Sequence, residues 1–347
     1  MPPCSERGGT RTYLFPADNK KALNLAIKDQ IAALEWVKAN IEAFGGDKHK
    51  VTAFGESAGA IMTSILYFNS PLSKLVRGVI LESGSPASPL TSNAEAREID
   101  WQNFVGGVPS CADLATSGNT FDCIKAANTS EIFQGLLTSL SLSQEQFAFD
   151  PTIDGPDGLY PDIPSRLFAK GQFARVPFIT GTNLDEGTLF TPFTINSEQQ
   201  VHDFIIANFS PPIVPAQKLE TTAEKLVELY PNIPALGSPF NTGNETFGLS
   251  SGLDDTEGDV AFQAQRRNFN QVAANAGLQS HGYLFTEPQP GSGPLGGPHW
   301  EQYTTANQVI MDLNSANLSM IPDDYRKEQI AFINDMAVVF HHRRDID

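Results

Sequence analysis

The sequence predicts an α/β fold with a parallel-type central sheet and helices on both of its faces. Two observations carry this prediction. Helix-like and strand-like segments alternate between residues 22 and 85, which is typical of parallel strands joined by crossover helices. Hydrophobic residues make up 40% of the 347-residue chain, which is ordinary for a globular protein and too high for a disordered one.

Each early element has its own pattern. Residues 22–44 are predicted to form a helix that a glycine pair ends, because apolar residues recur there every three or four positions. Residues 51–54 and 79–81 are short apolar runs typical of buried strands, and residues 58–68 return to a helical pattern. The apolar face of the first helix consists of Leu23, Ile27, Ile31, Leu34, Val37 and Ile41.

The rest of the chain continues the pattern with longer helical insertions. After an irregular segment at 1–13, residues 14–347 are expected to form one domain without internal repeats, mostly helical over 90–150. The further elements expected are strands at 176–180 and 282–286, helices at 216–230, 259–276 and 322–343, and a Pro/Gly-rich loop at 288–298.

Charge and cysteine content restrict the class of protein. The net charge of −17 repels phosphate backbones and anionic membrane surfaces, so nucleic-acid binding is not expected, and no apolar run is long enough for a membrane span. A close cysteine pair and several glycosylation sequons favour a secreted protein. No signal peptide follows Met1, so either the protein is cytosolic or this N-terminus is not the natural one. Pro211 weakens the sequon at Asn208, which leaves Asn128, Asn244 and Asn317 as candidates.

A serine flanked by glycines lies between the predicted strand 51–54 and the predicted helix that begins at Ala58. Gly55-x-Ser57-x-Gly59 in this context is typical of a strained strand-to-helix turn that exposes a nucleophilic hydroxyl. The glycines are needed because side chains there would clash with the neighbouring strand and helix. The backbone N–H of Ala58, at the helix start, is positioned to donate to an oxyanion.

A serine nucleophile needs a general base and an acid that orients it. Enzymes with this turn place the acid and then the histidine on loops after later strands, and His299 fits that order. His281 lies at the wrong end of its strand. Asp185 and Glu186 both follow the strand 176–180, and spacing alone does not separate them. The other histidines, which fit less well, are His49, His202, His341 and His342.

At this point the sequence resembles the type-B carboxylesterases, a family that includes cholinesterases and fungal lipases. The segments that carry the resemblance are Asn24–Gln30, Trp36–Ile41, Phe44–Asp47, Val51–Gly59, Glu82–Pro86, Asp154-Gly155, Val176–Gly187 and the His299 loop.

The resemblance implies an α/β-hydrolase fold and a serine carboxylesterase or lipase that acts through an acyl-enzyme, without a cofactor or metal. It implies that Glu186 is the acid and that Cys111 and Cys123 form a disulfide. It also matches Ser83 to a serine beneath the triad and Glu56 to a glutamate beside the nucleophile. The expected substrate is a small-molecule or lipid ester.

The departures from the family lead to a second set of expectations. The family's N-terminal strands and its His-Gly-Gly oxyanion segment have no counterpart here, Gly8-Gly9 does not replace that segment, and Cys4 has no evident partner. We therefore expect a parent protein truncated at both ends, with an incomplete sheet and a signal peptide that is lost with the N-terminal part. The parent would be extracellular, and this chain alone would be poorly soluble and nearly inactive.

Other functions are weighed against this interpretation. A non-catalytic, esterase-like binding or adhesion domain, or an inactive truncated product, is the main alternative. The letters Gly291-x-Gly293-x-x-Gly296 match a dinucleotide fingerprint, but Pro294 and Pro298 follow and no helix begins there. No metalloprotease motif is present, and the run from Asp254 to Glu257 lacks calcium-loop spacing. The oligomeric state stays open.

Overall fold

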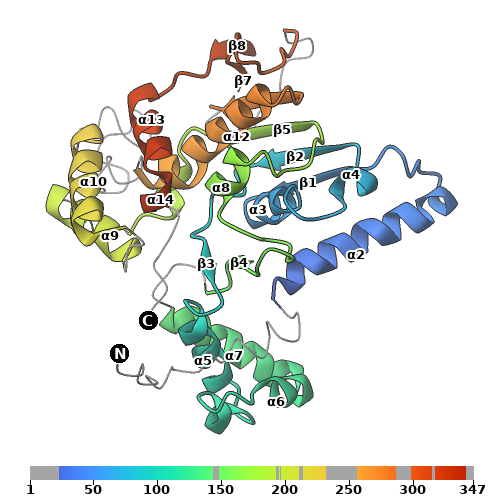
Figure 1. Cartoon of the computed structure of the whole chain (residues 1–347), viewed down its shortest axis with the longest axis vertical. Helices are drawn as coiled ribbons and strands as arrows, with labels where there is room; N and C mark the ends of the chain where they lie inside the picture. Colours follow the sequence, from blue (N-terminus) through green and yellow to red (C-terminus); the bar gives the residue numbers. More distant parts are fainter. Residues whose placement is uncertain are drawn as a thin grey trace, which may run out of the picture.

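A six-stranded sheet forms the centre of the chain in the computed structural model, with strand order β1-β2-β5-β6-β7-β8 (Figure 1). The structure describes residues 23–143, 148–192, 195, 197–210, 214–231, 256–286, 298–314 and 317–340. The first five strands in this order run parallel, and β8 pairs with β7 in the antiparallel sense. The strands are β1 Thr52–Glu56, β2 Gly78–Glu82, β5 Phe178–Asn183, β6 Ser280–Phe285, β7 Val309–Leu313 and β8 Ser319–Pro322. A separate two-stranded sheet pairs β3 Ser92–Asn93 with β4 Thr152–Ile153.

Helices connect the strands and form two further groups beside the sheet in Figure 1. The connecting elements near the sheet are α2 Leu25–Asn40, η1 Ile41–Phe44, α3 Ala58–Ile65, α4 Leu72–Leu75, α8 Pro164–Ala169, η3 Glu186–Leu189, η6 Asp259–Gln263 and α12 Ala264–Asn275. The first group is α5 Glu98–Gly106, η2 Ala112–Leu114, α6 Phe121–Ala126 and α7 Thr129–Leu142. The second is α9 Glu198–Asn208, α10 Ala216–Leu229, α13 Lys327–Asp335 and α14 Ala337–Phe340.

One face of the sheet carries the main core. Register aligns Val79 of β2 with Phe178 of β5, so their side chains share that face. Phe269 of α12 stacks on Phe178 with ring centroids 4.4 Å apart, and Ala60 and Ile65 of α3 are fully buried in the same cluster. Burying each such aromatic or aliphatic side chain contributes about 1.5–3 kcal/mol to folding. The sheet and its crossover helices are therefore joined by one continuous apolar contact.

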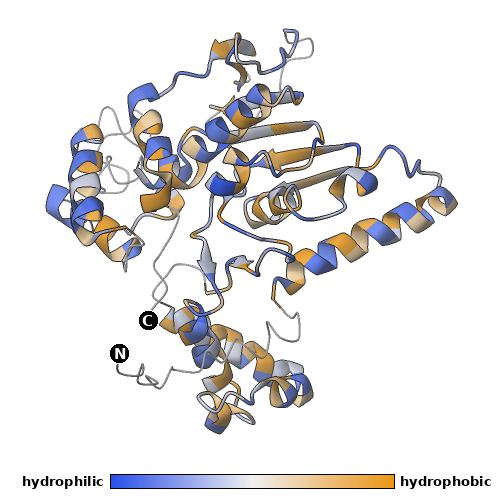
Figure 2. Ribbon diagram, in the orientation of Figure 1, coloured by the Kyte–Doolittle hydropathy of each residue, from blue (hydrophilic) through white to orange (hydrophobic). Residues whose placement is uncertain are grey.

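The opposite face of the sheet is less covered. Phe54 of β1 aligns with Ile80 of β2 and Ile179 of β5 on that face. Phe54 is 72% exposed, while Ile80 and Ile179 are half-buried. Apolar residues also reach the surface on α2 and η1. Trp36 and Phe44 are exposed there, with their rings tilted by 46° to each other, and Figure 2 shows apolar segments along α2. Apolar side chains on β1, α2 and η1 thus remain in contact with solvent.

The predicted alternation of helices and strands is confirmed, as is the α/β class, with strand ends shifted by one to three residues. The predicted helix at 322–343 is wrong at its start. Pro322 ends β8, and Asp323 turns inward to a buried ion pair with Arg266. Arg326, in a left-handed conformation (φ 46°), then precedes α13, so the ion pair and this turn delay the helix to Lys327. The sequence patterns predict neither β7 and β8 nor the short strands β3 and β4.

Several predictions fall on residues outside the described ranges. These are the irregular segment 1–13, the pair Gly8-Gly9, the fingerprint letters at 291–296, the sequon at Asn244, and His341 and His342. The extent of a single domain over 14–347 stays a prediction. Among the described residues no helix is both long and apolar enough to cross a bilayer.

Candidate active site

Ser57 lies at a strained turn between β1 and α3. Its backbone has φ 52° and ψ −121°, and residues other than glycine rarely adopt such a positive φ. Its N–H donates to Glu82 O of β2 at 2.9 Å, which ties the turn to the neighbouring strand. A Cβ at Gly55 would lie 2.4 Å from the carbonyl carbon of Gly59, so the predicted need for glycine at Gly55 is confirmed. The same prediction for Gly59 is wrong, because a Cβ there would have open space around it. Ala58 is the first residue of α3, where backbone N–H groups have no intrahelical acceptor.

A second strained serine lies beside the first. Ser83 follows β2 as Ser57 follows β1, and it also has a positive φ of 53°. Its N–H donates to Gly181 O of β5 at 2.8 Å. A Cβ at Gly84 would lie 2.8 Å from Ser57 O, so the two turns pack backbone against backbone. Two adjacent strands are therefore each followed by a serine with positive φ, a strained feature that clusters at functional sites.

The carboxylate of Glu186 is held by the second of these serines. Its Oε1 accepts hydrogen bonds from the Ser83 hydroxyl at 2.5 Å and from the Asn183 backbone N–H at 2.6 Å. Burial raises the pKa of Glu186, and so does the charge of Glu56. The hydrogen bonds from Ser83 and Asn183 lower it, but burial outweighs them and the pKa is raised overall. Spacing had left Asp185 and Glu186 open, and it is Glu186 that contacts Ser83.

The face of the sheet opposite the main core carries the acidic side chains of Glu56 and Glu82 at the carboxyl ends of β1 and β2. Register aligns Glu56, Glu82, Gly181 and Tyr283 across four neighbouring strands. The side chains of Glu56, Glu82 and Tyr283 therefore lie on one face, with Gly181 between Glu82 and Tyr283. A Cβ at Gly181 would lie 2.2 Å from the Tyr283 ring, so the ring covers this glycine. Burial, followed by the charges of Glu82, Glu186 and Glu56, raises the pKa of Tyr283. The phenol thus stays neutral beside the carboxylates.

The histidine is the least fixed member of the predicted set. His299 is exposed, and within the described ranges no hydrogen bond joins it to Ser57 or Glu186. The segment after it runs along β6, since Trp300 Nε1 donates to Gly282 O at 3.1 Å and Tyr303 N donates to Ser280 O at 2.8 Å. The path from Tyr303 back to His299 therefore leads toward the carboxyl end of β6. That end lies on the same edge of the sheet as Ser57 and Glu186.

His281 differs from His299 in its surroundings. It lies near the start of β6, at the opposite edge of the sheet, and its Nδ1 is 3.0 Å from Glu301 O. This placement agrees with the expectation that His281 lies at the wrong strand end.

Comparison with known proteins decides the family. A profile described as the carboxylesterase family matches residues 7–329. The chain belongs to the carboxylesterase family. Lipase 2 of Geotrichum candidum is 28% identical to it, over 89% of this chain and 62% of the lipase. A secreted triacylglycerol lipase of Gibberella zeae is 35% identical, over 73% of this chain and 43% of that lipase. The chain thus spans roughly half the length of these two relatives.

The fold of this carboxylesterase-family chain also matches a solved structure. The crystal structure of Aspergillus niger EstA superposes with a TM-score of 0.72 at 21% sequence identity, covering 92% of this chain and 70% of EstA. The predicted α/β-hydrolase fold is therefore confirmed.

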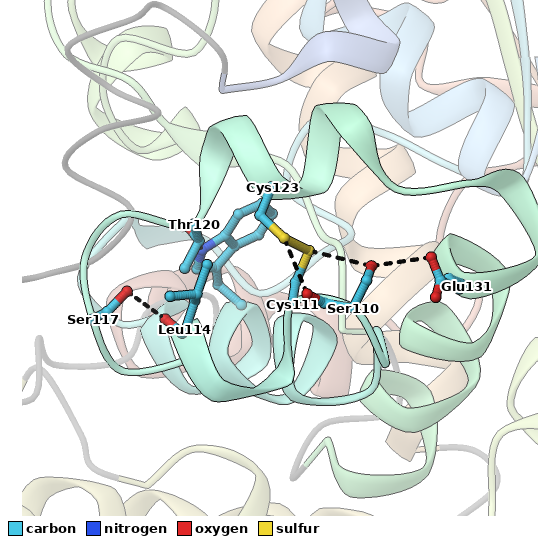
Figure 3. Close-up of a disulfide and its surroundings, with 8 residues drawn as sticks. Ser110, Cys111, Leu114, Ser117, Thr120, Cys123 and Glu131 are labelled. Carbon is cyan, nitrogen blue, oxygen red and sulfur yellow. Dashed lines mark hydrogen bonds between the residues drawn. A yellow bond between two sulfur atoms is a disulfide. The ribbon is translucent and has the colours of Figure 1, made fainter.

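A disulfide closes the first helical group of the carboxylesterase chain (Figure 3). Cys111 and Cys123 are bonded, and Cys111 is buried in a small cluster with Phe104, Val105 and Val108. The hydroxyl of Ser110 beside it donates to Glu131 Oε2 of α7 at 3.0 Å. The bond therefore ties the loop that follows α5 to α6, as the resemblance implied.

Two of the candidate glycosylation sites lie at the surface. Asn128 and Asn317 are both exposed. The side chain of Asn128 caps α7 by accepting from Glu131 N at 3.0 Å. Asn208, by contrast, is half-buried at the end of α9.

Proposed function

We propose that this chain carries the catalytic residues of a serine carboxylic-ester hydrolase, a carboxylesterase or lipase, with Ser57 as nucleophile. The observation that carries the proposal is the backbone of Ser57. Ser57 is held at positive φ on a turn between a strand and a helix, with Gly55 packed against the backbone of α3, and this arrangement supports an exposed nucleophilic hydroxyl. Membership of the carboxylesterase family supports the same chemistry.

The proposed reaction proceeds in two halves. His299 removes the proton from Ser57 Oγ, which attacks the ester carbonyl carbon to form a tetrahedral oxyanion. The oxyanion collapses, the C–O bond to the alcohol breaks, and His299 returns its proton to the leaving alkoxide. Water then attacks the acyl-enzyme, with His299 again taking a proton and returning it to Ser57. The carboxylic acid leaves and the serine is restored.

Glu186, Ala58 and their neighbours have supporting roles in this scheme. Glu186 would hold the His299 tautomer and stabilise the imidazolium, as the third member of a triad does. The Ala58 N–H would donate to the oxyanion, where each such donor contributes roughly 10²–10³ in rate. Ser83 fixes one oxygen of Glu186, and Glu56 adds negative charge beside the nucleophile.

The substrate would be a small-molecule or lipid ester, because relatives are named as lipases. The name of the Gibberella zeae relative includes the word secreted, which supports an extracellular parent protein. Exposure of Asn128 and Asn317 is compatible with N-glycosylation at both sites.

Covalent labelling with a fluorophosphonate probe tests the nucleophile. Labelling is more sensitive than turnover, since a single phosphonylation of the serine, with loss of fluoride, suffices even where hydrolysis is slow. The wild-type chain should be labelled on the peptide that contains Ser57, and the Ser57→Ala variant should not. His299→Ala should lower the labelling rate by about 10²-fold or more, the usual contribution of a general base. His281→Ala is the matched control and should label at the wild-type rate.

Each outcome separates the candidates. Absence of labelling in a folded wild-type chain would favour a binding domain or an inactive product. Equal labelling of His299→Ala and wild type would remove His299 from the mechanism while leaving Ser57 in place.

A further inference from the structure

A π-helical turn packs against the loop that carries Glu186. The turn is η6, Asp259–Gln263, which runs directly into α12. Such turns are rare, and they frequently occur at functional sites. Asp259 faces away from the sheet, where it accepts from the Tyr230 hydroxyl at 2.5 Å, whereas Gln263 faces β5. The wide turn thus directs two buried polar side chains to different partners.

The amide of Gln263 clamps the end of β5 at two consecutive residues. Gln263 Oε1 accepts from the Thr182 hydroxyl at 2.8 Å, and Gln263 Nε2 donates to Asn183 O at 2.9 Å. Gln263 is 1% exposed and Thr182 is fully buried. A buried amide with both ends paired is rigid, since breaking either hydrogen bond leaves a buried polar group without a partner.

The clamped residue is the one that holds Glu186. The Asn183 backbone N–H donates to Glu186 Oε1 at 2.6 Å, so the peptide groups on both sides of Asn183 are fixed, one by Gln263 and one by Glu186.

Two further contacts join the same helix to the same loop. A Cβ at Gly258 would lie 2.8 Å from Gly187 N and 3.4 Å from Glu186 Cβ, so only glycine allows this approach. The Phe262 ring stacks on Phe190, the residue after η3, at 5.5 Å. The π-helical turn and the glycine before it therefore contact the Glu186 loop at three places: before the glutamate at Asn183, at Glu186 itself, and after it at Phe190.

We propose that Gln263 is a positioning residue for Glu186: its amide fixes the Asn183 peptide and thereby the carboxylate that orients the base. The proposal rests on the proposed function for its catalytic consequence, but the contact itself is independent of it. Gln263→Met removes both hydrogen bonds and keeps the length of the side chain. Gln263→Glu keeps an acceptor for Thr182 and loses the donor to Asn183. Gln265→Met is the control, because Gln265 is also buried and its amide donates to Val260 O of η6 and not to Thr182 or Asn183.

The first measurement is hydrogen exchange at the Asn183 amide, which does not need activity. Gln263→Met and Gln263→Glu should exchange this amide at least about tenfold faster than the wild type, because local opening becomes easier. Gln265→Met should not. Unchanged exchange at Asn183 in both Gln263 variants would overturn the proposal.

The second measurement is the rate of Ser57 labelling by the fluorophosphonate. Gln263→Met should slow it about tenfold to 100-fold, the scale expected when a catalytic group loses its alignment. In a Glu186→Gln background the same substitution should have no further effect, because the two residues act as one unit. Losses that multiply in the double variant would show a merely structural role and overturn the proposal. Failure of the wild type to label, with faster exchange in the Gln263 variants, would reject the hydrolase and retain the clamp.

Discussion

Asp323 offers a severe test of how buried charge stabilises this fold. Its side chain is fully buried after β8 and accepts from Arg266 Nη2 at 2.7 Å, Arg267 Nε at 3.0 Å and the Tyr303 hydroxyl at 3.1 Å. The Asp323→Asn variant leaves two buried guanidinium groups without their counter-charge. Breaking a buried pair in this way costs about 3–5 kcal/mol, and we expect that loss in the free energy of unfolding.

The pKa of Asp323 supports the sign and scale of this loss. The arginines outweigh burial and lower the pKa of Asp323 from 3.8 to about 2. A lowered pKa means that the stabilisation is present above the unfolded value and is lost as pH falls through about 2. The shift corresponds to about 2 kcal/mol, less than the loss in Asp323→Asn is expected to be, because a protonated carboxyl still occupies the site. The gap in stability between wild type and variant should therefore narrow by about 2 kcal/mol between pH 4 and pH 2.

Urea unfolding followed by circular dichroism measures the effect. Asp162→Asn is the control, because Asp162 pairs with Arg166 and Lys170 at the surface and should lose less than about 1 kcal/mol. A loss in Asp323→Asn no larger than that of the control would refute the reasoning, as would a stability gap that stays constant down to pH 2.

Three further changes have defined outcomes. Gly55→Ala places a Cβ 2.4 Å from the backbone of α3, so it should abolish labelling of Ser57 while circular dichroism still reports a folded sheet; full labelling would contradict the packing. Replacing Cys111 and Cys123 by serine removes a cross-link spanning 12 residues, which should lower the free energy of unfolding by about 3 kcal/mol, and reduction of the wild type should match it. Burial raises the pKa of Glu186 above 4.5, so wild-type stability should fall as pH rises from that value, and Glu186→Gln should gain relative to wild type from pH 4 to pH 7 in thermal unfolding.

The local parts of the site could be predicted from the sequence. Ser57 is defined by its own neighbours, because the flanking glycines and the change from strand to helix lie within a few residues. Glu186 needed the family resemblance, since spacing could not separate it from Asp185, and the contact that distinguishes them comes from Ser83, 103 residues away.

The non-local parts of the site could not be predicted from the sequence. The clamp at Asn183 comes from Gln263, 80 residues further along, and nothing in the letters around Gln263 indicates a π-helical turn. The same holds for the end of the sheet. Pro322 suits the first turn of a helix as well as the end of a strand, and only the buried pairing of Asp323 with Arg266 decides between them.

β1, the strand that leads into Ser57, is also the outermost strand of the described sheet. β1 has a paired neighbour on one side, β2, so the strained turn after it is stabilised through Glu82 O from that side. Within the described part of the chain the other side of β1 is unpaired, and its backbone donors and acceptors lie next to the exposed ring of Phe54. Any polypeptide strand that adds to this edge would favour the conformation that it binds, and by linkage would stabilise the turn at Ser57. The reactivity of Ser57 would then depend on whether a strand is bound at this edge. Because binding depends on concentration, labelling rates should be compared at fixed protein concentration.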